Sequence, residues 1–244
     1  MELANLIKAG IRVFHEEGFT VFIKKLFRFV YTKVRFVCLK IVDLTGLGYV
    51  LAPFIAHEIR KLTRNFHGIQ NAVAFAFSFE RFGVSIKPCQ IEYEIAKLIE
   101  LVYSIKPKVI LEIGTANGGS LFLFTRVAES NATLISIDLP GGMFGGGYPR
   151  WKIPIYKAFA RENQKIFLIR ADSHNPATLK KLVSILGGRK IDFLSIDGDH
   201  IYKGVKKDFE TYSPLVRKGG IIAFHDIVPA PQRMLVVFRS FGVK

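Results

Sequence analysis

The feature that most constrains this chain is an alternation of short apolar runs with helical segments, which begins near residue 91. Five runs have the length of buried strands: Val109–Ile113, Thr133–Ile137, Ile166–Ala171, Asp192–Ile196 and Ile221–Phe224. Segments of helical character precede and separate them: Ile91–Tyr103, Ser120–Ser130, Ile153–Asn163, Ala177–Leu186 and Val205–Leu215. Strands that alternate with helices form a mostly parallel sheet covered by helices on both faces. We therefore expect an α/β fold of three layers, with ligands bound at the carboxyl ends of the strands.

The first two strand ends predict a nucleoside site. The first run continues into a glycine-rich turn, Gly114–Gly119, and glycine lets a backbone turn tightly and approach a ligand closely. The second run ends at Asp138, where a carboxylate can accept both hydroxyls of a ribose. Each feature alone is also explained by an ordinary turn or helix cap. The turn lacks the GxGxxG pattern, which disfavours a nicotinamide oxidoreductase.

The third strand end carries Asp172 and Ser173. Asp172 could accept a hydrogen bond from an adenine amino group, or it could belong to the cap of the helix after Pro176. The spacing alone does not separate these two interpretations.

The last two strand ends hold the strongest chemistry. Asp197 follows the fourth run and the pair His225-Asp226 follows the fifth, so adjacent parallel strands would bring them together. Carboxylates with an imidazole suit a divalent metal ion. His200 comes three residues after Asp197 and could act as a general base. The alternative is that all of them are turn residues satisfied by backbone donors.

Composition excludes some classes of protein and leaves others open. Half of the 244 residues are hydrophobic, which excludes a disordered chain, and two cysteines are too few for a disulfide scaffold. The net charge of +15 favours anionic partners such as membrane headgroups, nucleic acid or phosphorylated substrates. Nucleic acid is the least favoured partner, because the chain has neither a separate RNA-binding module nor an Asn-Pro-Pro-Tyr motif.

Residues 1–65 are expected to form a basic, amphipathic helical extension before a domain over residues 66–244. Apolar residues recur at helical spacing between residues 19 and 41, with lysines and arginines mainly on the other side. Such a helix can lie peripherally on a membrane; the alternative is packing on its own domain or on a second subunit of a homo-oligomer. We expect no secretory leader and no membrane-spanning helix, hence a cytoplasmic location, at the inner membrane surface if the helix binds lipid.

Taken together in their order, five segments resemble one enzyme family. They are Glu112–Gly119, Asp138–Gly142, Tyr148–Trp151, Ile196–His200 and His225-Asp226. This pattern resembles the class I S-adenosylmethionine-dependent methyltransferases, and more narrowly methyltransferase family 24, the metal-assisted group with cephalosporin hydroxylase-like proteins and macrolide-sugar O-methyltransferases. The resemblance implies a Rossmann-like fold and S-adenosylmethionine as cofactor, with Mg²⁺ or another divalent cation.

The resemblance also implies roles for single residues. Glu112 and the turn formed by Gly114, Thr115, Ala116, Asn117, Gly118 and Gly119 would hold the methionine part of the cofactor, Asp138 the ribose, and Asp172 with Ser173 the adenine. Asp197 would contact cofactor and metal together with the metal ligands His225 and Asp226, although relatives often carry an acidic residue at the position of His225. His200 matches the catalytic base, and Gln90 a lid residue near the cofactor. Tyr148 and Trp151 would cover the site, with Trp151 either stacking on a flat acceptor or anchoring the loop.

The carboxyl end departs from this family pattern. Class I methyltransferases usually add two strands after the fifth, the last one antiparallel, whereas only 18 residues follow Asp226. Pro229 and Pro231 make a loop, and Met234–Phe238 could form one short strand or helical turn. We expect a shortened carboxyl end, with the fifth strand exposed or covered by another chain.

The resulting functional expectation is metal-assisted O-methylation of a small hydroxylated acceptor, such as a sugar, glycolipid or natural product. The alternative is a truncated or degenerate relative that binds the cofactor without turnover.

Overall fold

The computed structural model describes residues 12–13, 16–66, 68–142, 147–225 and 236–239. The chain forms two compact units, residues 1–48 with 82–84 and residues 49–81 with 85–244. The smaller unit contains the long helix α2 (Phe19–Thr45), and α3 (Leu47–Thr63) belongs mainly to the larger unit. The predicted helical extension is confirmed, while the predicted domain boundary at residue 65 stays a prediction.

The two long helices of the amino-terminal part, α2 and α3, follow each other directly in the sequence. No single helix in the described part of the chain is long and apolar enough to cross a membrane. The consecutive helices α2 and α3 meet the length and composition criterion only when they are taken together.

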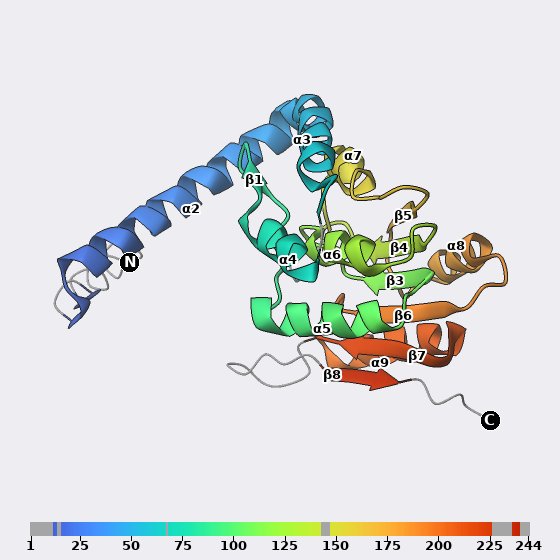
Figure 1. Ribbon diagram of the computed structural model, residues 1–244. Helices are drawn as coiled ribbons and strands as arrows, with labels where there is room; N and C mark the ends of the chain where they lie inside the picture. Colours follow the sequence, from blue (N-terminus) through green and yellow to red (C-terminus); the bar gives the residue numbers. More distant parts are fainter. Residues whose placement is uncertain (1–11, 14–15, 67, 143–146, 226–235, 240–244) are drawn as a thin grey trace. The chain divides into compact units, whose positions relative to one another are not determined.

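A six-stranded sheet organises the larger unit (Figure 1). Its strands lie in the order β5-β4-β3-β6-β7-β8. Their bounds are β3 (Val109–Ile113), β4 (Thr133–Asp138), β5 (Lys165–Arg170), β6 (Ile191–Ile196), β7 (Val216–Phe224) and β8 (Val236–Arg239). The first five are parallel, and β8 is antiparallel to β7. All five predicted strands are thus confirmed, and β7 begins five residues before its apolar run.

The expected edge at the fifth strand is wrong. Strand β8 pairs with β7 over Ile221–Phe224, so the chain covers this edge itself. Three of the four residues of β8 lie within Met234–Phe238, the segment that the sequence left open between a strand and a helical turn. This pairing covers the last four of the nine residues of β7.

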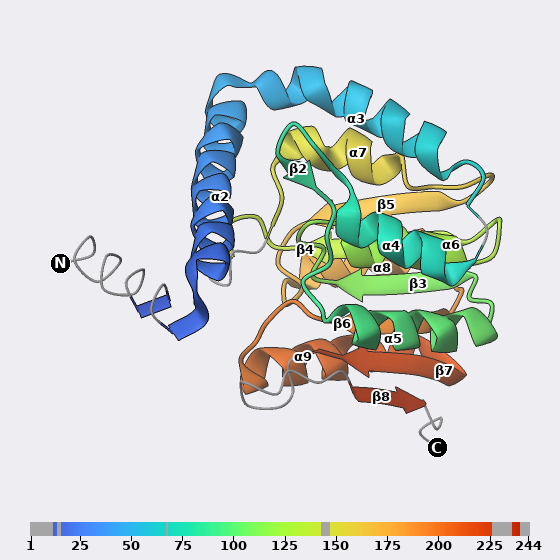
Figure 2. The same cartoon turned by 60° about the vertical axis from the view of Figure 1, so that its left-hand side comes forward.

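Helices cover both faces of the sheet (Figure 2). On one face lie α4 (Ile69–Ser78), α5 (Glu92–Ser104) and α6 (Gly119–Val127); on the other lie α8 (Pro176–Leu186) and α9 (Tyr202–Tyr212). Strand side chains alternate between the two layers. Leu111 and Ile113 pack in a core with Leu182 of α8 and Tyr212 of α9. On the opposite face, Phe124 of α6 stacks edge-on against Phe193 of β6 at 5.0 Å. The expected three-layer α/β fold is confirmed.

Four of the five predicted helices extend as expected, and the helix predicted over residues 153–163 is shorter. The 3-10 turn η1 (Arg150–Lys152) leads into α7 (Ile153–Lys157), and α7 ends six residues before the predicted end of the helix. The chain then turns so that Arg161 and Gln164 donate hydrogen bonds to carbonyls at the carboxyl end of α6, including that of Thr125. These carbonyls would otherwise lack partners, which explains the interruption. The remaining short elements are β1 (Glu80–Arg81), β2 (Val84–Ser85) and η2 (Ser213–Leu215).

Candidate functional site

The turn after β3 places a glycine, Gly114, at the carboxyl edge of the sheet. Gly114 has φ +96°, and its N–H donates to the carbonyl of Ile137 at 2.8 Å. A Cβ atom added at Gly114 would lie 2.1 Å from the carbonyl oxygen of Asp197. Because both the positive φ and this close approach exclude a side chain, the turn requires glycine here. Helix α6 then begins at Gly119, so the turn presents backbone N–H groups beside the strand ends.

Asp138 fixes this turn from the end of β4. One carboxylate oxygen accepts hydrogen bonds from the backbone N–H groups of Thr115 (3.2 Å) and Ala116 (2.9 Å), and the other accepts from Gly147 (3.0 Å). Burial raises the pKa of Asp138, and these backbone donors oppose the rise. The carboxylate therefore braces two loops at once, and its predicted contact with a ribose stays a prediction.

Glu112 lies deeper than the sequence suggested. Its two carboxylate oxygens accept hydrogen bonds from the buried hydroxyls of Ser120 (2.5 Å) and Ser136 (2.6 Å). The hydroxyl of Ser136 also lies 2.5 Å from that of Thr115. Burial raises the pKa of Glu112 to about 8. Glu112 thus forms a polar support beneath the turn and is not among the residues that line the cavity above it.

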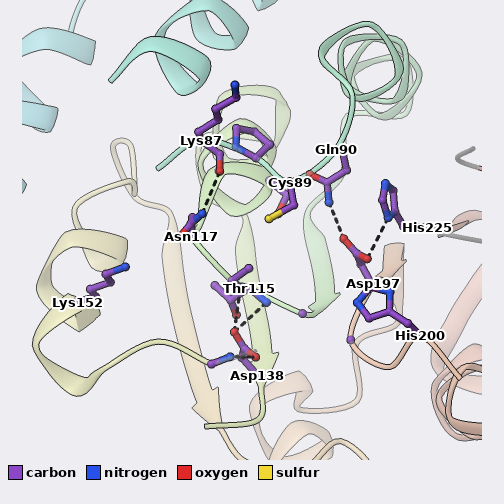
Figure 3. Close-up of a pocket in the computed structure, with 17 residues that line it drawn as sticks. Lys87, Cys89, Gln90, Thr115, Asn117, Asp138, Lys152, Asp197, His200 and His225 are labelled. Atoms are coloured by element: carbon purple, nitrogen blue, oxygen red, sulfur yellow. Dashed lines mark hydrogen bonds and ion pairs between the residues drawn. The ribbon is translucent and has the colours of Figure 1, made fainter. Parts of the chain in front are cut away.

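Asp197, at the end of β6, joins two segments that are distant in the sequence (Figure 3). The side-chain amide of Gln90 donates to one of its oxygens at 2.6 Å, across 107 residues of chain. The ring nitrogen Nδ1 of His225 lies 3.2 Å from the other oxygen. The neighbouring strands β6 and β7 end together, at Ile196 and Phe224, and this register brings Asp197 next to His225 as predicted.

Two cavities meet at this edge. The larger has a volume of about 550 Å³ and the smaller about 200 Å³. They share three lining residues, Gly114, Asp138 and Gly198. Of the predicted residues, the larger cavity is lined by Gln90, Gly114, Thr115, Ala116, Asn117, Gly119, Asp138, Asp197, His200 and His225. The two adjoining spaces suit an elongated ligand with two chemically different ends.

The smaller cavity contains the predicted adenine residues, Asp172 and Ser173. Helix α8 is capped by the side chain of Asn175, which accepts from the N–H of Ala177. Asp172 instead accepts from the N–H of His174 at 2.8 Å, and the hydroxyl of Tyr212 donates to the carbonyl of Ser173 at 2.5 Å. Asp172 is therefore not the helix cap, and its turn is tied to the core of the domain.

Some expected residues are placed elsewhere. Gly118 lies outside both sets of lining residues and precedes α6 with φ +82°, where an added Cβ would lie 2.7 Å from the ring of Tyr156. Tyr148 and Trp151 are both buried, which favours the role of Trp151 as a loop anchor over stacking on an acceptor. Asp226 lies outside the described residues.

The structure also adds residues that the sequence did not reveal. Lys87, Cys89 and Lys152 line the larger cavity (Figure 3). Lys87 and Cys89 precede α5, and Lys152 belongs to η1, so none of them follows a strand of the sheet. The one available signal was their sequence proximity to Gln90 and Trp151.

The described residues fit the predicted organic cofactor better than the predicted metal. For the cofactor they offer a glycine cradle, two adjoining cavities and the buried amide oxygen of Gln90, which has no hydrogen-bond partner among the described residues. For a metal, the described part of the chain contains no group of three or more His, Cys, Asp or Glu side chains that could hold the ion. Asp197 and His225 supply two donors, and ligation with Asp226 stays a prediction.

A family comparison connects this geometry with known sequences. Residues 111–227 match the family model described as "Methyltransferase domain", methyltransferase family 24. The matched segment runs from β3 past the end of β7 and includes Asp138, Asp197 and His225. This matched segment is similar to methyltransferase domains and makes up 117 of the 244 residues, just under half of the chain.

Two curated relatives resemble about half of this chain. The uncharacterized protein y4gI of Sinorhizobium fredii is 27% identical over 129 residues, which is 52% of this chain and 14% of that protein. The uncharacterized protein R132 of Acanthamoeba polyphaga mimivirus is 36% identical over 116 residues, 48% of this chain and 50% of that protein. The chain thus spans half or less of the length of these two relatives.

Solved structures resemble about two thirds of the chain at low sequence identity. The methyltransferase MycE, from the mycinamycin biosynthetic pathway and solved with Mg, SAH and mycinamycin VI, is 16% identical with a TM-score of 0.45, covering 66% of this chain and 40% of that one. An O-methyltransferase from Bacillus cereus in complex with SAH is 16% identical with a TM-score of 0.45, covering 68% and 70%.

Proposed function

We propose that this protein transfers the methyl group of S-adenosylmethionine to a hydroxyl oxygen of a small acceptor, such as a sugar, glycolipid or natural product. The observation that carries the proposal is the pair of cavities that meet at Gly114 and Asp138, beside the turn of the segment that is similar to methyltransferase domains. When bound, S-adenosylmethionine supplies a methyl group already activated on a sulfonium.

The residues around the larger cavity divide the remaining work. The backbone from Gly114 to Asn117 and the amide oxygen of Gln90 would bind the amino-acid end of the cofactor. The smaller cavity, with Asp172, would bind the adenine end. Aligning the reacting atoms is then the main catalytic contribution of the protein.

His200 is the residue we propose for proton removal. It lines the larger cavity and is exposed there, three residues after Asp197. A hydroxyl is a weak nucleophile at neutral pH, so an imidazole that accepts its proton would favour attack on the methyl carbon. No step of this proposal depends on a metal ion.

Calorimetric titration with S-adenosylmethionine tests the binding half of the proposal, with two alanine variants. Gly114→Ala would place a Cβ 2.1 Å from the carbonyl oxygen of Asp197, whereas Gly188→Ala meets nothing within 4 Å at a similar φ of +83°. We expect Gly114→Ala to weaken binding at least about tenfold and Gly188→Ala to leave it nearly unchanged. Equal affinity of both variants, or a folded wild-type chain that does not bind, would contradict the proposed site.

The transfer half is tested by S-adenosylhomocysteine formation with a panel of hydroxylated acceptors. His200→Gln should lower turnover by about a hundredfold or more while the dissociation constant for S-adenosylmethionine changes little. Chelation by EDTA in the same assay tests the predicted metal. Cofactor binding without transfer to any acceptor would instead favour the alternative of a relative without turnover.

A further inference from the structure

Helix α2 carries an apolar stripe that is exposed along its whole length. Eight residues form this α2 stripe at spacings of one to four: Ile23, Leu26, Phe27, Val30, Val34, Val37, Ile41 and Leu44. All eight are exposed, up to 75% for Phe27 and 85% for Leu44. A helix of 27 residues is about 40 Å long. The apolar surface of the α2 stripe is therefore far larger than that of a single exposed apolar residue. A continuous exposed apolar surface of this kind marks a contact with lipid or with another molecule.

The few less exposed residues of α2 lie mainly away from the α2 stripe. Val42 is buried, and Val21 and Leu39 are partly buried. At 100° per residue, these three positions lie on the side of the helix away from Val30 and Val34, whereas Phe22, also partly buried, borders the stripe. The residues of the α2 stripe are exposed, so core packing does not account for them.

Positive charge accompanies the α2 stripe. Helix α2 contains six lysines and arginines, at residues 24, 25, 28, 33, 35 and 40, against one acidic residue, Asp43. By helical position, Lys33 and Lys40 border the stripe on one side and Lys24 on the other. Lys25 is paired with Glu17 at 2.5 Å, on the side away from the stripe. Long lysine side chains beside an apolar stripe can extend to a layer of anionic headgroups.

We propose that α2 binds an anionic lipid surface, lying in the plane of the interface with the α2 stripe toward the acyl chains. The flanking lysines would contact the headgroups, each contributing through attraction to the negative surface potential. Seven charged residues within α2 exclude a spanning orientation, which agrees with the absence of a single spanning helix in the described part of the chain. The α2 stripe belongs to the smaller unit and does not line the cavities, so this proposal stands apart from methyl transfer.

Charge also argues against a second copy of the chain as the occupant. Two helices packed along the α2 stripe would bring Lys24, Lys33 and Lys40 of both copies to one seam. Asp43, three residues after Lys40, could balance at most one of these charges in each copy. An anionic surface matches this charge, whereas an identical helix repeats it.

Vesicle co-sedimentation of the full chain tests the proposal with a matched pair of variants. Val34→Gln lies in the α2 stripe, and Thr32→Gln lies on the opposite, exposed side of the same helix. Both changes leave the charge and the helix intact. With phosphatidylcholine vesicles containing about a third phosphatidylglycerol, we expect Val34→Gln to lower partitioning at least about tenfold and Thr32→Gln by no more than about twofold.

Neutral vesicles and salt complete the test. Partitioning should fall strongly on pure phosphatidylcholine and on raising the salt from about 0.1 M to about 1 M. No binding to anionic vesicles, equal binding to neutral ones, or equal losses for the two variants would overturn the proposal. Sedimentation velocity without lipid gives one more outcome that would overturn the proposal. If the wild-type chain self-associates and Val34→Gln, but not Thr32→Gln, makes it monomeric, the α2 stripe binds a second copy of the chain.

Discussion

Asp138 and Asp197 occupy equivalent places and are held in different ways. Asp138 is the last residue of β4 and Asp197 directly follows β6, the two strands that flank β3, and both line the larger cavity. Asp138 accepts from three backbone N–H groups, whose positions are fixed by the fold. Asp197 interacts with two side chains, of Gln90 and His225, which can rotate away. The comparison suggests that Asp138 maintains the site, whereas Asp197 can exchange its partners for a ligand.

The largest expected effect is the loss of stability in Asp138→Ala. The change leaves three backbone N–H groups near the cavity without their acceptor, at a cost of about 2–4 kcal/mol in the free energy of unfolding. Asp197→Ala, the matched variant, should cost less than about 1 kcal/mol because its partners are side chains. Urea unfolding of both variants measures the difference, and similar losses would remove the distinction between the two carboxylates.

Glu112 provides the next test, because it lies on β3 between them. Burial raises the pKa of Glu112 to about 8, from 4.5, and the charges of Asp138 and Asp197 add to the rise. Between these two pKa values the folded chain binds more protons than the unfolded chain, so the free energy of unfolding falls as the pH rises. Glu112→Gln removes this dependence and keeps a hydrogen-bonding group beside Ser120 and Ser136.

We therefore expect Glu112→Gln to gain stability relative to the wild-type chain as the pH rises, by at most about 1.4 kcal/mol per pH unit. Unfolding in urea at several pH values between about 5 and about 8 measures this gain, with Glu92→Gln on an exposed position of α5 as control. A stability difference that does not vary with pH would show that Glu112 is ionised in the folded chain.

Asp197→Asn should affect ligand binding more than stability. If Asp197 exchanges partners for the cofactor, the dissociation constant for S-adenosylmethionine rises about tenfold, while the free energy of unfolding changes by less than about 1 kcal/mol. Calorimetry and urea unfolding on the same preparation separate the two effects. A large loss of stability with unchanged affinity would make Asp197 a structural residue like Asp138.

The smallest expected effect belongs to Gln90→Ala. It removes one donor to Asp197, so we expect a change of about 1 kcal/mol, or about fivefold, in cofactor affinity. Stability should change by less than about 0.5 kcal/mol, since the lost bond joins two side chains. Calorimetry measures the change in cofactor affinity, with Gln70→Ala on α4 as the control. A loss of stability as large as that of Asp138→Ala would contradict the view that Asp197 can exchange its partners.

Much of the sheet could be predicted from the sequence, and parts of the site could not. Runs such as Val109–Ile113 are almost wholly apolar, with Glu112 as the exception, because parallel strands are buried on both faces, and this makes them recognisable. Lys87 and Lys152 come from segments outside the sheet, whose place at the cavity depends on how α5 and η1 pack. Strand β8 was only partly predictable because a four-residue pairing leaves little periodic signal.

By itself, the sequence determined which strand ends share an edge, and hence that Asp197 and His225 would be neighbours. The reason is local: five apolar runs alternating with helices can form little other than a parallel sheet, whose carboxyl ends coincide. Only the tertiary structure decided the partners of each carboxylate, from Ala116 beside Asp138 to Gln90 beside Asp197. Hydrogen bonds act over about 3 Å. The partners in these two bonds are 22 and 107 residues apart in the sequence, so the packing of whole elements decides whether they meet.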